Sequence, residues 1–249
     1  MSNPFQIIHV IQNGDDLNSI AKQYQTNMQD IVSANQGVNF YNLYVGDSLN
    51  VMPGDGYRVK LHAPGAKNVT MSFAKVALRD EMRKLWEQHN AWTMRVIVSI
   101  LSSLPDEQAV TRRLLRNPVD FEKLFSHYYG ESVGRKIKEL LTDHLVIAAN
   151  LIKALKAGDA TKAAEENRKW FINADEIAKA LASINPNWKQ QDMKNMFDKH
   201  LNLLNQAVSR RMQGNYVAEI QALDLNELHS LEMADALSNG IWKQSHGRV

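Results

Sequence analysis

The sequence contains no cysteine among its 249 residues. Disulfide bonds, thiolate metal sites and thiol catalysis are therefore excluded. It also lacks any run of about 18 apolar residues, so no membrane span is expected. Residues 1–6 have neither the basic segment nor the apolar core of a secretory signal. We therefore expect a protein that is made in the cytoplasm.

The sequence also has no large excess of either charge, because its net charge is only +2. This near balance gives no support to general nucleic-acid binding. Residues 1–53 are acidic, with Lys22 as their one basic residue against Asp15, Asp16, Asp30 and Asp47. Such a segment is not drawn to anionic polymers by charge, so any binding there must depend on shape and hydrogen bonds.

Several catalytic signatures are missing as well. The chain has no glycine-rich phosphate loop, no Gly-x-Ser-x-Gly and no His-Glu-x-x-His. We therefore predict no catalytic residues and expect no cofactor, and we favour a binding protein over an enzyme.

Residues 5–53 have the pattern of a small α+β domain. A β-branched run at Ile7–Gln12 predicts a strand, and Asn13-Gly14 predicts a turn. Two short helices should follow, the first capped by Asp15 or Asp16, and Ser48–Met52 predicts a second strand. The predicted order is strand, helix, helix, strand (βααβ).

Three segments of this domain carry a family resemblance: His9–Leu17, Asp30–Asn35 and Asn42–Val51. Together they resemble a LysM module, a small domain that docks on N-acetylglucosamine polymers such as peptidoglycan and chitin. The resemblance implies a shallow sugar groove between the loop after the first strand and the loop before the second. The residues it places there are Asn13, Gly14, Asp15, Asp16, Leu17, Asn42, Leu43, Tyr44 and Val45.

In this groove we expect backbone groups to reach the acetamido group, with Gly14 allowing the chain to come close. Leu43, Tyr44 and Val45 can supply an apolar floor. Asp16 is a departure, because the family commonly has threonine there, and it adds a charge at the rim. The alternative is that Asp15, Asp16 and Leu17 only begin a helix and that the module is a surface for protein interaction or assembly.

Residues 54–70 are rich in glycine and polar residues and are predicted to be a linker, with an extra short strand at Tyr57–Leu61 as an option. Residues 71–245 predict an all-α antiparallel helical bundle, because apolar residues recur at helical spacing and the connections are short. The long helices are expected at about 72–103, 131–157, 159–183, 189–214 and 216–243.

Three histidines, His89, His144 and His200, fall on apolar stripes near the middle of their helices, and Asp235 lies near the middle of the last helix. In an antiparallel bundle these midpoints meet at one level, so the four residues are candidate ligands for iron, manganese or zinc. The Glu-x-x-His pattern of di-iron bundles is missing. We therefore favour a structural polar core, with an acid–base pocket as a third option.

The helical part also resembles a family of uncharacterised helical proteins from spore-forming Gram-positive bacteria, and this resemblance implies deposition on the spore coat or cortex, or on the cell wall. The preferred hypothesis is a carbohydrate-binding protein whose helical domain contacts other envelope proteins or itself. The segments that carry the resemblance are Leu85–His89, Leu140–Leu145, Asn173–Ala178 and Met233–Asp235.

Overall fold

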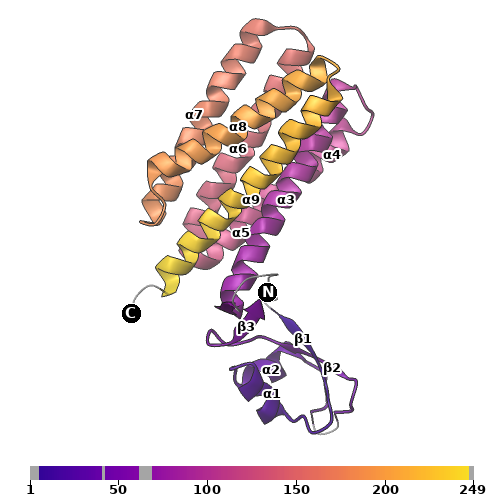
Figure 1. Cartoon of the computed structure of the whole chain (residues 1–249), viewed down its shortest axis with the longest axis vertical. Coiled ribbons are helices and arrows are strands. Elements are labelled where there is room, and N and C mark those ends of the chain that lie inside the picture. Colours follow the sequence, from indigo (N-terminus) through magenta and orange to yellow (C-terminus); the bar gives the residue numbers. More distant parts are fainter. Residues whose placement is uncertain (1–5, 41–42, 62–68, 247–249) are drawn as a thin grey trace. The chain divides into compact units, whose positions relative to one another are not determined.

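A computed structural model describes residues 6–40, 43–61 and 69–246. The chain divides into two compact units, Met1–Glu81 and Met82–Val249. The first contains two two-stranded sheets, two short helices and the beginning of a long helix, and the second is helical (Figure 1). The predicted fold class, a βααβ domain followed by a helical bundle, is therefore confirmed.

The first unit begins with an antiparallel strand pair, β1 (Ile7–Val10) and β2 (Ser48–Val51). His9 is opposite Leu49 in the register, and Ile8 is opposite Asn50. Because side chains alternate along a strand, His9 and Leu49 lie buried on one face, whereas Ile8 and Val10 are exposed on the other.

Helices α1 (Leu17–Gln23) and α2 (Met28–Ala34) supply the rest of the small core. Asp16 caps α1 in a capping box with Ser19, which satisfies backbone groups that the first turn leaves unpaired. The buried core consists of Ile11, Ile20, Ala21, Tyr24, Ile31, Leu49 and Val51.

One buried amide ties α2 to the sheet. Asn35 donates through Nδ2 to the carbonyl oxygens of Ile31 and Asn50, each at 2.7 Å, and its Oδ1 accepts from the Asn50 N–H at 2.7 Å. These three bonds fix the end of α2 against β2.

In place of a simple linker over 54–70, the structure has a second strand pair, β3 (Arg58–Leu61) with β4 (Val69–Ser72). Tyr57 packs against the small core, with its ring centroid 5.2 Å from that of Tyr24. The optional strand at Tyr57–Leu61 is thus present. The pairing of β3 with β4 was not predicted, because Val69–Ser72 is short and follows a stretch rich in glycine and polar residues.

The helical region begins with a long helix, follows with two short ones and ends with four long ones. Figure 1 shows the long helices running alongside one another. Their bounds are α3 (Phe73–Leu101), α4 (Glu107–Leu114), α5 (Asn117–Tyr129), α6 (Glu131–Lys156), α7 (Ala160–Ile184), α8 (Gln190–Met212) and α9 (Tyr216–His246).

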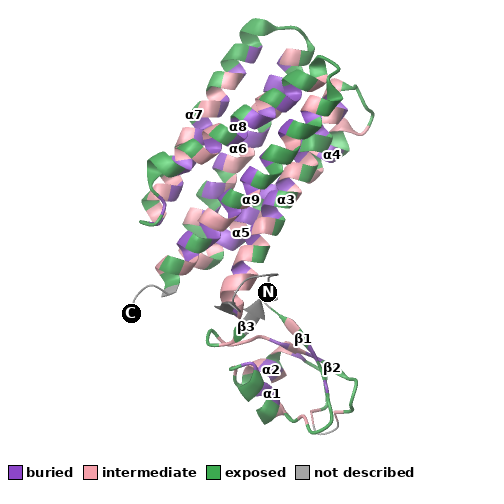
Figure 2. Ribbon diagram, viewed as in Figure 1, coloured by how far each residue is buried: buried purple, intermediate pink, exposed green. Residues whose placement is uncertain are grey.

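Sequential helices from α5 to α9 pack as neighbours, and α9 returns against α3. Asp235 of α9 pairs with Arg83 of α3, and Asn226 donates to Asn90 further along, so these two helices run antiparallel. Figure 2 shows the buried residues gathered between the helices. Among the described residues, no helix is long and apolar enough to cross a membrane.

Candidate functional site

Two tight turns of the same construction lie at one end of the β1–β2 pair. In the first, Gln12–Asp15, the Asp15 N–H donates to the Gln12 carbonyl at 3.1 Å. In the second, Tyr44–Asp47, the Asp47 N–H donates to the Tyr44 carbonyl at 3.0 Å. Both turns have glycine in the third place. The two predicted groove loops are therefore both built around a short glycine turn.

Each turn is closed a second time by its own aspartate. The Asp15 carboxylate accepts from the Gln12 N–H at 2.7 Å, and the Asp47 carboxylate accepts from the Tyr44 N–H at 2.9 Å. A carboxylate that accepts a backbone N–H in this way holds a turn in one conformation. Both carboxylates are therefore hydrogen-bonded within their own turns.

The turns are joined to each other through Ile11. The Ile11 N–H donates to the Asp47 carbonyl at 2.8 Å, and the Gly46 N–H donates to the Ile11 carbonyl at 2.9 Å. Ile11 is itself buried in the small core. The spacing of the turns is thus set by backbone bonds anchored in the core, which is the preorganisation that a backbone-based binding site requires.

A buried histidine supports the first turn from below. His9 Nε2 donates to the Asp15 carboxylate at 2.9 Å, and His9 Nδ1 is paired with the Tyr24 hydroxyl at 3.0 Å. Hydrogen bonds from the Gln12 backbone and from His9 lower the pKa of the Asp15 carboxyl. Asp15 is therefore ionised at neutral pH, and the chain Tyr24–His9–Asp15 connects α1 to the turn.

The structure assigns different surroundings to the predicted groove residues. Tyr44 and Val45 are exposed, with 63% and 69% of their surface accessible, so they can offer apolar surface to a ligand. Leu17 and Leu43 are half-buried and pack against the small core, which leaves little of their apolar surface accessible to a ligand. Asn13 and Gly14 are exposed on the first turn, Asp16 is exposed but engaged as the helix cap, and Asn42 lies outside the described residues.

Gly14 has a conformational role in addition to the close approach of a ligand that was predicted for it. Its φ is +92°, a conformation that side chains disfavour, whereas a Cβ built there would meet nothing within 4 Å. Gly46 has the same character, with φ +100° and open space around it. Glycine at these positions therefore fixes the shape of each turn, and the space beside it stays open.

Sequence reasoning missed His9, Gly46 and Asp47 as parts of the site. The signal was present, because Gln12-Asn13-Gly14-Asp15 and Tyr44-Val45-Gly46-Asp47 share a Gly-Asp ending. One such tetrapeptide after the first strand and another before the second strand indicate paired turns. His9 carried no comparable signal, because a histidine in a strand is compatible with either face.

In the bundle, all three predicted histidines are buried, but they have different partners. His144 accepts through Nε2 from the Trp170 indole N–H at 3.1 Å. Its Nδ1 then carries the proton and donates to Asn173 Oδ1 at 2.8 Å, and Asn173 Nδ2 donates to the Leu140 carbonyl at 3.0 Å. Both ring nitrogens of His144 are thus used, and neither is available to a metal ion. Burial lowers the pKa of His144 to about 4.

His89 and His200 face each other with ring centroids 5.5 Å apart, and the Trp86 ring lies against both. Among the described residues, His89 Nε2 and both ring nitrogens of His200 are buried with no hydrogen-bond partner. Burial, reinforced by nearby histidines, lowers the pKa of His89 to about 3 and that of His200 well below its usual range. Both rings are therefore neutral at pH 7.

Asp235 does not join the histidines. Its carboxylate is bound by Arg83, with Arg83 Nε at 2.7 Å, and it is one third exposed. In the part of the chain that the structure describes, no group of three or more histidine, aspartate and glutamate side chains is placed to hold a metal ion. Of the predicted set, only His89 and His200 lie ring to ring, whereas Trp170 binds His144 and Arg83 binds Asp235.

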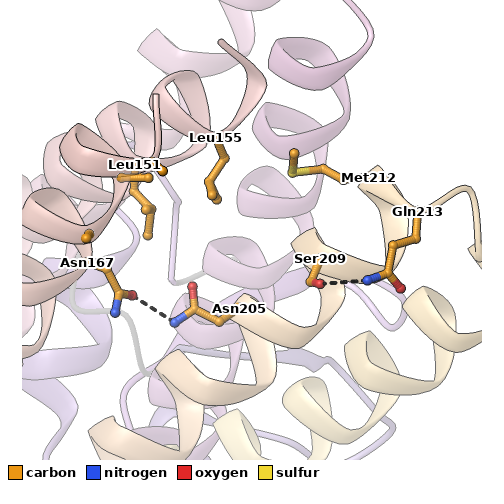
Figure 3. Close-up of a pocket in the computed structure, with 10 residues that line it drawn as sticks. Leu151, Leu155, Asn167, Asn205, Ser209, Met212 and Gln213 are labelled. Atoms are coloured by element: carbon orange, nitrogen blue, oxygen red, sulfur yellow. Dashed lines mark hydrogen bonds between the residues drawn. The ribbon is translucent and has the colours of Figure 1, made fainter. Parts of the chain in front are cut away.

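The bundle also has an open groove of about 690 Å³ between α6, α7 and the end of α8 (Figure 3). Its ten lining residues contain no ionisable side chain, and Asn205 Nδ2 donates to Asn167 Oδ1 at 3.0 Å along one side. These ten residues therefore supply no acid or base for proton transfer at this groove.

Comparison with known proteins agrees with the geometry of the first unit. The family model of the LysM domain matches residues 9–51, which contain both turns, the end of β1 and all of β2. No curated protein and no solved structure matches the chain. The matched segment ends before the bundle, and nothing in these comparisons supports the resemblance of the bundle to an uncharacterised helical family.

Proposed function

We propose that the two joined turns bind N-acetylglucosamine polymers of the peptidoglycan or chitin type, and that this binding brings the helical bundle to the cell wall or the spore envelope. The LysM match over residues 9–51 supports the ligand class. The observation that carries the proposal is the pair of glycine turns locked at a fixed spacing through Ile11. A rigid backbone site of this kind suits the neutral acetamido groups of such polymers.

The surface chemistry of the turns supports sugar recognition by backbone and apolar contact. Tyr44 and Val45 are the first two residues of the second turn and are exposed, so an acetyl methyl group or a sugar face can pack on them. The nearby carboxylates of Asp15 and Asp47 are satisfied within their own turns. Asp16 adds a charge at the rim, so a neutral polymer should be preferred over a heavily anionic one.

A sedimentation assay with insoluble peptidoglycan and chitin tests the proposal on the full chain. We expect retention that survives moderate salt, because residues 1–53 are acidic and recognition does not depend on charge attraction. Replacing Tyr44 by Ala and Val45 by Ser should weaken retention by about tenfold, because it removes the apolar surface that packs on the sugar. Both side chains are exposed, so the replacement should change the stability of the domain little.

Met28→Ala is the matched control, because Met28 is an exposed apolar residue on α2 of the same unit. It should leave retention unchanged. Equal retention of the Tyr44/Val45 variant and the parent would contradict the assigned surface. No retention of the parent on either polymer would favour the alternative, in which the module is a protein-interaction surface.

A metal site in the bundle is the second candidate function, and one observation favours keeping it. His89 Nε2 and both nitrogens of His200 are buried and without hydrogen-bond partners among the described residues. Two imidazoles are fewer than the three or four ligands of most protein zinc sites. The structural role is therefore preferred, and the metal content of the purified protein decides between them.

A further inference from the structure

The first half of α9 carries an exposed apolar face that the bundle does not use. Tyr216, Val217, Ile220, Leu225 and Leu228 are each 56–70% exposed. At about 100° per residue, Val217, Ile220 and Leu228 fall within roughly 80° of the helix circumference. Figure 2 shows exposed surface along this part of the helix. An apolar stripe of this length in solvent is typical of a docking surface.

The opposite face of the same segment is already buried in the bundle. Ala222, Asn226, His229 and Ser230 are all at most 5% exposed. Asn226 and Ser230 contact Asn90 of α3, and His229 contacts the Met196 carbonyl of α8. The helix is therefore held firmly from behind, and the exposed stripe is presented on a rigid support.

The charged side chains that α9 itself places on this face are all negative, and Arg211 of α8 lies over the Tyr216 ring at the start of the helix. Residues 216–242 contain no lysine or arginine. Asp224 and Glu227 are exposed beside the apolar stripe, and among the described residues neither has an ion pair or a hydrogen bond from a side chain. Three other acids of α9 do have cationic partners: Glu219 with Arg211, Glu232 with Lys199 and Asp235 with Arg83. The two unpaired acids are thus confined to the apolar face.

From this combination we infer that the Val217–Leu228 face of α9 docks a basic amphipathic helix of a partner protein. The apolar side of such a helix would cover Val217, Ile220 and Leu228, and its lysines or arginines would pair with Asp224 and Glu227. A second copy of this chain brings two acidic faces together without a cation, and an anionic membrane surface repels the same acids. A basic helix is the occupant that satisfies both the apolar and the charged groups.

A designed peptide of about 20 residues tests the inference on the full chain. It has leucines at helical spacing on one side and lysines on the other, and its partner peptide has glutamates in place of the lysines. Fluorescence anisotropy of labelled peptide should show saturable one-to-one binding of the lysine form, with the glutamate form weaker by at least about tenfold. Sedimentation velocity of the protein alone should show a monomer.

Two variants locate the binding. Val217→Ser with Leu228→Ser should weaken binding of the lysine peptide by at least about tenfold, because it removes the apolar stripe. Asp224→Asn with Glu227→Gln should weaken binding and flatten its salt dependence. Val146→Ser, at an exposed apolar position of α6, is the matched control and should change nothing. Circular dichroism confirms that each variant is folded.

The inference is overturned if the lysine peptide does not bind, or if both variants bind it as the parent does. The second result would place the peptide on the acidic first unit, whose residues 1–53 carry four aspartates and one lysine. A dimer that Val217→Ser with Leu228→Ser converts to a monomer would assign the face to a second copy and would also overturn it. None of these outcomes depends on whether the chain binds a sugar.

Discussion

Acidification should destabilise the helical bundle before any carboxylate titrates. His89 and His144 have pKa values lowered by burial to about 3 and about 4, whereas an unfolded histidine titrates near 6.5. Above pH 6.5 the imidazoles are neutral in both states, so their contribution to stability is fully present. As the pH falls below 6.5, these histidines become protonated in the unfolded chain but stay neutral in the folded one, so the free energy of unfolding decreases.

The expected size follows from this window. For each histidine that is protonated only in the unfolded chain, the free energy of unfolding falls by roughly 1.4 kcal/mol per pH unit. At pH 5 each of the two histidines therefore lowers it by about 2 kcal/mol. The two together give about 4 kcal/mol, a large part of the stability of an ordinary domain. His200 adds to this in the same direction, because its pKa is also lowered by burial.

The contacts of His144 explain why the folded state resists protonation. Its Nε2 accepts from the Trp170 indole N–H at 3.1 Å, so a second ring proton would point at a donor. The proton on Nδ1 is held by Asn173 Oδ1 at 2.8 Å. Protonation must therefore break the Trp170 contact inside a buried core as well as bury a charge.

Urea unfolding followed by circular dichroism at pH 7, 6 and 5 measures the effect. We expect the midpoint to fall steadily over this range. His89→Phe, which keeps a ring beside Trp86, should lower the pH dependence by about one proton if the variant folds. His127→Gln is the control, because His127 is exposed on α5. A midpoint that stays constant from pH 7 to pH 5 would refute the assignment of neutral buried histidines.

Three further outcomes are expected. Asn35→Ala should lower the stability of the first unit by about 1–3 kcal/mol, because it leaves the Asn50 backbone groups unpaired, whereas Gln36→Ala beside it should be neutral in thermal unfolding. Gly240→Ala should destabilise the bundle by about 1–3 kcal/mol, because the new Cβ would lie 1.9 Å from Trp188 Nε1, and the exposed Asn239→Ala should not. Protein expressed with added zinc, iron and manganese should contain less than about one ion in ten chains by elemental analysis. A stoichiometric ion that is lost in His200→Ala would replace the structural reading of the histidine pair.

Periodicity in the sequence predicted most of the fold. The long helices end within a few residues of the predicted positions, because Gly158, Asn185-Pro186 and Gly214 interrupt the apolar pattern where α6, α7 and α8 end. The burial of His89, His144 and His200 followed from their places on apolar stripes. Local pattern was sufficient in these cases because each helix is stabilised mainly by the face it buries.

Pairing between distant residues could not be predicted in the same way. Asp235 was predicted to share a layer with His89, but it pairs with Arg83, which precedes His89 by more than a helical turn, whereas Asn90 pairs with Asn226 and Ser230. Likewise, only the packed structure shows that Trp170 and Asn173 of α7 bind the two ring nitrogens of His144. Which face of a helix is buried follows from the sequence, whereas the level at which two helices meet and the partner of each side chain depend on packing.

In the candidate site, the loops were predicted and the bonds within them were not. The resemblance gave the two segments around Gly14 and Tyr44, and the structure adds that Asp15 and Asp47 close the turns they end. The sequence could not predict that Leu17 and Leu43 are half-buried, because an apolar residue at such a position can line the groove or pack in the core.

Titration of the ¹⁵N-labelled full chain with chitooligosaccharides tests the central claim most directly. The account predicts that the amide signals of residues 12–15 and 44–47 shift together and saturate, while those of the bundle stay in place. If the signals of both turns remain unmoved at millimolar oligosaccharide, the turns do not bind N-acetylglucosamine polymers and the account is contradicted.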